Sequence, residues 1–219
     1  MADEAAEPAE PSRRQAHKLR TERALQQAAL ALFGEQGYDT TTTDEIAERA
    51  GVSPRTFFRY FPTKESVLFV GEYGWLQSFN KAFLAQPEDL SDLDAMRATL
   101  HTLAPDLTKR RAALVLYDKA VASSPTLRGG VFDHQQQDIA AIAGAIATRR
   151  DLTEPDLACT TLATVMLLTY RNGVMRWLSA PATADIRDFI AEGFDLLVAE
   201  LAPAPPTGRR RGVLRSAAR

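Results

Sequence analysis

The chain has 219 residues, of which 45% are hydrophobic and 25% are charged, the composition of an ordinary soluble globular protein. Its single cysteine, Cys159, excludes an internal disulfide and argues against a cysteine-based metal site. The formal net charge of −2 is unevenly spread: residues 12–64 carry nine Lys/Arg against six Asp/Glu, whereas residues 65–202 carry twelve against eighteen.

The first residues, MADEAAEPAEP, are acidic and alanine-rich, whereas a signal peptide is basic and then apolar. No apolar run reaches the roughly eighteen residues that a membrane span needs. We therefore expect a cytoplasmic protein with no membrane partner. Residues 1–12 offer nothing to bury, and we expect them to form a disordered acidic arm.

A basic segment and a helix follow this arm. The basic residues either form a solvated charge run or contact the phosphates or minor groove of DNA: Arg13, Arg14, Lys18, Arg20 and Arg23. The apolar positions of the helix repeat with a 3.6-residue period, at Leu25, Ala28, Ala29, Leu32 and Phe33. Gly34 and Gly37 are expected to end it.

Residues 42–64 read as two short helices joined by a tight turn. Thr42 and Glu45 form a capping box, in which each side chain satisfies the other residue's amide. Gly51 supplies the left-handed turn that stops the first helix. Ser53-Pro54 opens the second helix with a hydroxyl N-cap and a proline at the first helical position, where no amide is needed.

The second short helix has an inner and an outer face. Phe57 and Phe61 lie four residues apart and are expected to pack on the first helix. Arg55, Thr56 and Arg59 then point outward, a set of side chains suited to the floor of a DNA major groove.

This stretch closely resembles the helix-turn-helix of TetR-type (tetracycline-repressor family) transcriptional regulators. The resemblance covers roughly residues 17–70 and is carried by Gly37-Tyr38, Thr41-Thr42, Ile46-Ala47, Ala50-Gly51-Val52-Ser53, Thr56, Tyr60-Phe61 and Lys64. It implies a three-helix DNA-binding head over residues 13–64. The DNA contacts that we expect are Thr42, Ser53, Pro54, Arg55, Thr56, Arg59, Tyr60 and Lys64.

Some of these residues have simpler interpretations. Arg59 is alternatively a solvated helix arginine, and Tyr60 a half-buried core tyrosine. Thr41 is expected to be buried and structural. The family usually has Leu-Tyr where this chain has Phe57-Phe58, so a tyrosine hydroxyl that commonly touches phosphate is missing.

From Thr63 onward the pattern stays helical, and no strand-like alternation appears in the sequence. We expect helices near 64–84, 91–104, 107–122, 126–149, 155–178 and 184–201, with breaks at Pro87, Pro105, Ser123-Ser124-Pro125, Glu154-Pro155 and Ala180-Pro181. The fold class is therefore all-α, with the head followed by a domain of about six helices over residues 65–202. Residues 203–219 form a flexible basic tail that either aids solubility or touches DNA weakly.

The resemblance implies that the middle helices enclose a small-molecule pocket. The candidates are Phe79, Phe83, Leu100, Leu103, Tyr117, Phe132, Ile142, Met166, Tyr170 and Arg171. For any one of the apolar residues, ordinary core packing is the alternative. Arg171 interrupts an apolar helix and needs a partner, which is an anionic ligand, an acidic residue of this chain or solvent at an interface.

The last two helices are expected to form a dimer interface. An apolar stripe with 3-4 spacing runs along the last helix, and the helix before it is apolar nearly all round. The resemblance points to pairing with a second copy of the chain. The interface candidates are Val165, Ile186, Phe189, Ile190, Phe194, Leu197 and Leu201, and the alternative is an internal core helix with no partner.

These observations favour a ligand-responsive transcriptional regulator, and a repressor in preference to an activator. It would bind a palindromic double-stranded DNA operator as a homodimer and be released by a small-molecule effector. The alternatives are an all-helical enzyme or a protein-interaction adaptor with a degenerate DNA-binding head. The sequence has no HExxH, GxSxG, CxxC or glycine-rich phosphate loop, and its three histidines lie far apart. We therefore expect no enzyme activity, no cofactor and no metal.

Overall fold

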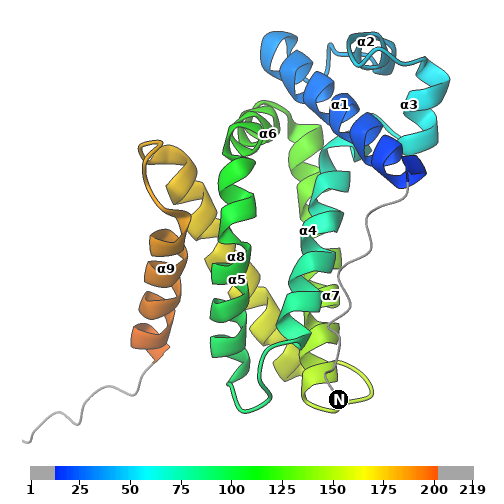
Figure 1. Cartoon of the computed structure of the whole chain (residues 1–219). Helices are drawn as coiled ribbons and strands as arrows, with labels where there is room; N and C mark the ends of the chain where they lie inside the picture. The colour runs from blue at the N-terminus through cyan, green and yellow to red at the C-terminus, as the bar shows by residue number, and fades with distance from the viewer. Residues whose placement is uncertain (1–12, 202–219) are drawn as a thin grey trace, which may run out of the picture.

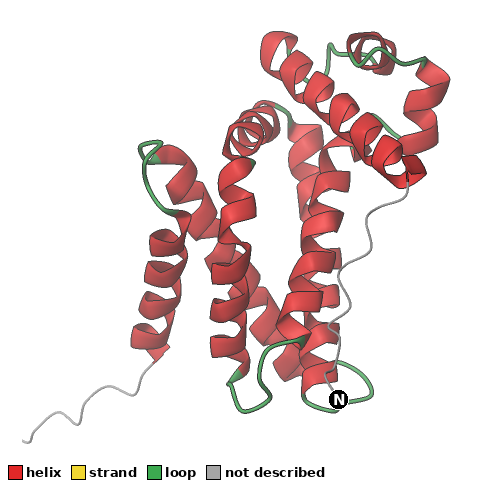
Figure 2. Cartoon of the chain, in the orientation of Figure 1, coloured by secondary structure: helices red, strands yellow, loops and turns green. Residues whose placement is uncertain are grey.

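A computed structural model describes residues 13–201, apart from the side chains of residues 15, 70–74 and 201. The helices in this range are α1 (Arg13–Gln36), α2 (Thr43–Arg49), α3 (Pro54–Tyr60), α4 (Ser66–Leu84), α5 (Asp92–Lys109), α6 (Arg111–Ser123), α7 (Pro125–Arg149), α8 (Leu157–Ser179) and α9 (Ile186–Leu201). Figure 2 shows no strand among them, so the all-α prediction is confirmed. The acidic arm and the basic tail of the sequence analysis lie outside the described residues.

Short polar side chains begin several of these helices. The hydroxyl of Ser91 accepts the amide of Asp94 at 3.1 Å, and the carboxylate of Asp156 accepts the amide of Cys159 at 2.7 Å. Each cap satisfies an amide that has no partner inside its helix. The local sequence therefore fixes where α5 and α8 begin.

The break predicted at Pro105 is wrong, because α5 continues through it to Lys109. A proline inside a helix removes one backbone hydrogen bond, here to the carbonyl of His101. Both residues are exposed, so water can satisfy that carbonyl. The helix instead ends at Lys109 and is capped by Arg110, whose amide bonds to the carbonyl of Leu107 at 3.0 Å.

The helices form two packed groups, as Figure 1 shows. Helices α1–α3 gather at one end of the molecule, and α4 leads from them into a bundle that α9 joins on the flank, beside α5 and α8. The core of the first group does not stop at residue 64. It also contains Val67 and Leu68 of α4, Ala120 of α6 and Leu127 of α7. The head is therefore joined to the bundle through a shared apolar cluster.

Helices α8 and α9 cross closely at small residues. A side chain at Gly173 of α8 would place its Cβ only 3.1 Å from the backbone oxygen of Phe189 in α9. A Cβ at Gly193 of α9 would lie 3.2 Å from the side-chain methyl group of Thr169 in α8 and 3.6 Å from its backbone oxygen. The missing Cβ atoms thus let the two backbones approach. Within the described part of the chain, no helix is long and apolar enough to span a membrane.

Candidate nucleic-acid interface and ligand cavity

The turn between α2 and α3 has the geometry that the sequence predicts. The amide of Thr42 donates to the Glu45 carboxylate at 2.8 Å, and the amide of Glu45 donates to the Thr42 hydroxyl at 3.2 Å. At the other end of α2, Gly51 has a φ of 70°, and its amide bonds to the carbonyl of Glu48 at 3.0 Å. The Val52 amide bonds to the carbonyl of Ala47 at 2.9 Å, which completes a Schellman motif.

Helix α3 begins at Ser53 and turns one aromatic ring inward. The Ser53 hydroxyl accepts the amide of Thr56 at 3.2 Å, and Pro54 occupies the first helical position. The rings of Phe57 and Phe61 are fully buried, in a cluster that also contains residues of α1, α2 and α4. These anchors fix which face of α3 points to solvent.

That outer face carries most of the DNA contacts expected from the sequence. Ser53, Pro54, Arg55 and Arg59 are exposed. Thr56 is half-buried, and so is Tyr60, over whose ring the Arg59 guanidinium lies at 5.1 Å from the centroid. The sequence-based set omitted a further exposed residue on the same face, Phe58.

Thr42 forms the capping box that the sequence predicted, whereas Lys64 is placed differently from what the sequence suggested. The Thr42 hydroxyl donates to the Glu45 carboxylate at 2.9 Å, so the capping box already uses it. The Lys64 ammonium donates to the backbone carbonyls of Tyr38 at 2.6 Å and Thr41 at 2.8 Å, and lies 4.1 Å from the centroid of the Tyr38 ring. In this structure Lys64 therefore holds the loop between α1 and α2 and does not present a free ammonium group to DNA.

Further polar contacts hold the same loop. The Tyr38 hydroxyl donates to the Glu65 carboxylate at 3.1 Å, and burial, followed by the nearby Glu65 charge, raises the pKa of Tyr38. Arg49 at the end of α2 makes a two-pronged ion pair with Glu35 of α1, at 2.5 and 2.7 Å, and this contact lowers the pKa of Glu35. The pair ties the first two helices together at the surface.

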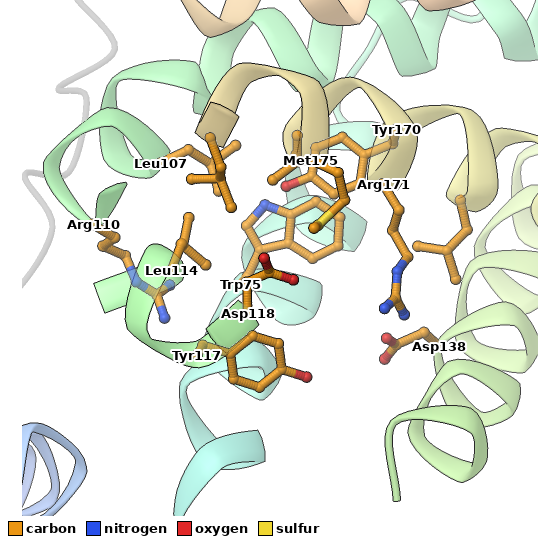
Figure 3. A pocket seen from close by; sticks show the side chains of 13 residues that line it. Trp75, Leu107, Arg110, Leu114, Tyr117, Asp118, Asp138, Tyr170, Arg171 and Met175 are labelled. Atoms are coloured by element: carbon orange, nitrogen blue, oxygen red, sulfur yellow. The ribbon is translucent and has the colours of Figure 1, made fainter. Parts of the chain in front are cut away.

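The bundle contains a cavity of about 100 Å³ that opens to solvent, shown in Figure 3. Five helices contribute its lining: Trp75, Leu107, Arg110, Leu114, Tyr117, Asp118, Asp138, Leu167, Tyr170, Arg171, Val174, Met175 and Leu178. The Trp75 ring stacks on Tyr170 with centroids 4.9 Å apart and planes at 11°. Its indole Nε1 is buried and has no hydrogen-bond partner among the described residues. A ligand with an acceptor group could satisfy it.

Charged groups meet on one side of the cavity. Figure 3 shows the side chains of Arg171 in α8 and Asp138 in α7 pointing toward each other. Burial raises the pKa of Asp138, and the charges of His134 and Arg171 oppose that rise. Arg171 also donates to the side-chain oxygen of Gln135 at 3.3 Å. Within the chain, Arg171 thus has a neutral hydrogen-bond partner, Gln135, and an acidic neighbour, Asp138.

Only part of the expected pocket lining reaches this cavity. Tyr117, Tyr170 and Arg171 line it. The bundle core holds Phe79, Phe83, Leu100, Ile142 and Met166, all at most 2% exposed. Leu103 lines an adjoining groove between α1 and α4–α6, and Phe132 is 60% exposed on α7. Helical periodicity marks an apolar face but does not distinguish a packed core from a cavity wall.

Sequence reasoning also missed lining residues. In the sequence, the spacing of Trp75 is the same as that of the buried aromatic residues on α4, so periodicity does not mark it as a cavity residue. Asp118 and Asp138 are acidic residues on helices, and such residues usually face solvent. Among the residues that the structure describes, no three His, Cys, Asp or Glu side chains gather closely enough to hold a metal ion.

The structure corrects the expected dimer contacts. Ile186, Ile190 and Phe194 are at most 5% exposed within the single chain, where they pack on α5 and α8. Little of their surface is therefore left for contact with a second copy. Val165, Phe189 and Leu197 are half-buried, and the Leu201 side chain lies outside the described part of the chain. The large apolar side chains that α8 and α9 leave exposed are Leu157, Leu168, Met175, Leu196 and Val198.

Comparisons with known proteins place similarity over both parts of the chain. Residues 25–69 match the model of the bacterial regulatory proteins of the tetR family, and residues 90–202 match the model of the MftR C-terminal domain. The chain is 41% identical over 86 residues to the HTH-type transcriptional regulator TcmR of Streptomyces glaucescens, a match that covers 39% of this chain and 38% of TcmR. It is 40% identical over 64 residues to the HTH-type transcriptional regulator HbdR of an Aromatoleum species, covering 29% of this chain and 28% of HbdR. These matches span less than two fifths of either curated relative.

Solved structures share the fold over most of the chain. The fatty acid degradation regulator FadR of Bacillus halodurans superposes with a TM-score of 0.57 at 18% identity, covering 83% of this chain and 96% of that one. A FadR of Thermus thermophilus, described as a TetR-family transcriptional repressor in complex with lauroyl-CoA, gives a TM-score of 0.52 at 21% identity, covering 84% and 98%. A SmeT–triclosan complex gives 0.56 at 19% identity, covering 84% and 96%.

Proposed function

The chain belongs to the TetR family of DNA-binding transcriptional regulators and is not an enzyme, and from that premise we propose that it is a ligand-responsive repressor. It binds a palindromic operator in the cytoplasm as a homodimer, and a small-molecule effector releases it. The observation that carries the proposal is the outer face of α3. Arg55 and Arg59 are exposed there, on a helix anchored by the fully buried Phe57.

Two kinds of contact support operator binding. An arginine in the major groove forms two hydrogen bonds with guanine, which is worth about 1–3 kcal/mol of discrimination against other bases. Arg55 and Arg59 are placed to make such contacts. Other exposed polar groups around the turn, such as the Ser53 hydroxyl, are placed to position the head on the sugar–phosphate backbone.

A homodimer is supported by the apolar surface that α8 and α9 leave uncovered. Leu168 and Met175 are 42% and 41% exposed on α8, and Leu196 and Val198 are 53% and 45% exposed on α9. Taking such a side chain from fully exposed to fully buried contributes roughly 1.5–3 kcal/mol, so burying the exposed half of each contributes about half of that. Two-fold symmetry counts each side chain twice. A two-fold dimer presents two copies of α3, and a palindromic operator follows from that symmetry.

Release by an effector is supported by the helices that join the cavity to the head. Trp75 of α4 and Tyr117 of α6 line the cavity, and the same helices bury Val67, Leu68 and Ala120 in the head core. A ligand that prefers one arrangement of α4 and α6 thereby changes the spacing of the two heads. To shift the ratio of the released to the DNA-binding conformation from 1:99 to 99:1, the ligand must bind the released conformation about 10⁴-fold more tightly than the DNA-binding one.

Arg111 extends this path to α8. It donates to the carbonyl of Trp177 at 2.8 Å, to that of Ala180 at 2.5 Å and to that of Pro181 at 2.9 Å, and it lies 4.6 Å from the Trp177 ring centroid. A movement of α8, which forms part of the cavity wall, would therefore displace α6 through Arg111. Because α6 also packs in the head core, the head would move with it.

Selection of duplexes from random DNA, followed by fluorescence anisotropy over a range of salt, tests operator binding. We expect a two-fold symmetric sequence whose log Kd varies linearly with log salt concentration. Arg55→Ala and Arg59→Ala should each relax base preference, whereas Arg187→Ala on α9, a control exposed to solvent, should not. Binding without sequence preference would favour the adaptor with a degenerate head.

The effector is tested separately. Small molecules that raise the melting temperature of the purified protein are added to the protein–operator complex. A repressor released by its effector should lose anisotropy with some of these molecules. Stabilising ligands that all leave the complex intact would contradict effector release without affecting the evidence for DNA binding.

A further inference from the structure

Phe58 is a large apolar residue on the polar outer face of α3. Its side chain is 53% exposed, and Arg55 and Arg59 flank it on the same short helix. The neighbouring aromatic residues of the helix, Phe57 and Phe61, are fully buried. Phe58 therefore contributes little to the core that holds the head together.

The ring of Phe58 has a defined contact despite its exposure. It meets the buried Phe57 ring edge to face, with centroids 5.4 Å apart and planes at 82°. Such a T-shaped pair is a favoured aromatic geometry. The inner ring thus supports the outer one, which projects from the helix between two guanidinium-bearing side chains.

The chemistry of the major groove narrows what this ring can contact. The edges of the base pairs offer hydrogen-bond donors and acceptors there, and the one apolar group among them is the 5-methyl of thymine. A phenyl ring has no hydroxyl with which to bond a phosphate. Its favourable contribution on DNA must therefore come from burying apolar surface.

We propose that Phe58 reads the 5-methyl group of a thymine in each operator half-site. This inference rests on the proposed binding of operator DNA through α3. Arg55 and Arg59 supply the hydrogen bonds to neighbouring bases or phosphates, and Phe58 adds a preference for an A·T pair at one position. It is thus a base-selecting residue beyond the polar set that the sequence analysis identified.

The test changes the methyl group and the ring separately. Operator duplexes selected by the wild-type protein are remade with deoxyuridine in place of thymidine, one symmetric pair of positions at a time, which removes only the 5-methyl group. Wild type, Phe58→Ala and the control Phe132→Ala are compared by anisotropy at fixed salt. Phe132 is 60% exposed on α7, so its truncation also removes a solvent-exposed ring, but one that lies away from the outer face of α3.

We expect one thymine at which deoxyuridine weakens wild-type binding about four-fold per half-site, the equivalent of about 0.8 kcal/mol for one buried methyl group. Phe132→Ala should show the same loss. Phe58→Ala should bind the thymidine operator more weakly and be indifferent to deoxyuridine at that position. Circular dichroism checks that its fold is intact, and the deoxyuridine effect on wild type does not depend on any variant.

Two results would overturn the assignment while leaving operator binding in place. One is wild-type binding that no deoxyuridine substitution weakens, and the other is a Phe58→Ala variant that remains as sensitive as wild type. If the wild-type protein selects no DNA sequence at all, that result refutes the proposed operator binding, and the proposed role of Phe58 is refuted as a consequence.

Discussion

Replacing Lys64 by methionine should destabilise the folded protein even in the absence of DNA. The substitution keeps most of the side-chain volume but removes the ammonium group that bonds to the carbonyls of Tyr38 and Thr41. The Tyr38 carbonyl keeps a second donor, the Thr41 amide at 3.3 Å. The effect at the Thr41 carbonyl is therefore the larger one.

The magnitude follows from these interactions. A hydrogen bond from a charged group contributes about 1.5–3 kcal/mol, and a cation–π interaction at a surface about 0.5–1 kcal/mol. Because the variant leaves the Thr41 carbonyl without this donor and the Tyr38 ring without its cation, Lys64→Met should lower the free energy of unfolding by about 2–4 kcal/mol. Urea denaturation followed by circular dichroism measures it.

Lys81→Met is the matched control, because Lys81 is an exposed lysine of α4. Exposed substitutions usually change stability by less than about 0.5 kcal/mol. Equal urea midpoints for Lys64→Met and wild type would refute the structural role of Lys64. In that case its ammonium group would be free for DNA, as the sequence pattern suggested.

Three further predictions concern the bundle. Leu196→Asp should give a folded monomer by light scattering, whereas Phe194→Asp should unfold the chain by circular dichroism, because Phe194 is fully buried and Leu196 is 53% exposed. Burial raises the pKa of Asp138, so the folded state binds the carboxyl proton more tightly than the unfolded state does. The free energy of unfolding should therefore fall as the pH rises from the ordinary carboxyl pKa through the raised pKa. Asp138→Asn should remove this loss, so its melting temperature should exceed that of wild type at pH 7 and the gap should close below pH 4. Gly173→Ala should lower stability by about 1–3 kcal/mol, because its Cβ would lie 3.1 Å from a backbone oxygen, and Gly129→Ala, with nothing within 4 Å, is the control for thermal melts.

The features that the sequence predicted well depend on neighbours only a few residues away. The capping box of Thr42 and Glu45, the positive φ of Gly51 and the cap at Ser53 each involve at most one turn of helix. The inward ring of Phe57 follows from periodicity over the same distance. Local rules therefore sufficed to place α3 and its exposed arginines.

The features that sequence reasoning missed depend on distant partners. The two carbonyls that hold Lys64 lie 23 and 26 residues earlier in the chain. Asp138 and Arg171 meet only because α7 and α8 pack side by side. On α9, periodicity indicated an apolar stripe but not its orientation, so the buried Phe194 was assigned to a surface. A one-dimensional pattern carries no information on which neighbour an apolar face meets.

The apolar cluster that joins the head to the bundle limits how freely this protein can exchange parts with its relatives. A chimaera cut at residue 64 would leave Phe57 and Phe61 facing foreign residues where Val67, Leu68, Ala120 and Leu127 now close the cluster. Large side chains transplanted without their neighbours meet either voids or clashes. A DNA specificity grafted from another regulator should therefore travel with matching residues on α4, α6 and α7. Recombination in nature meets the same constraint, so heads and bundles of this type are expected to diverge together.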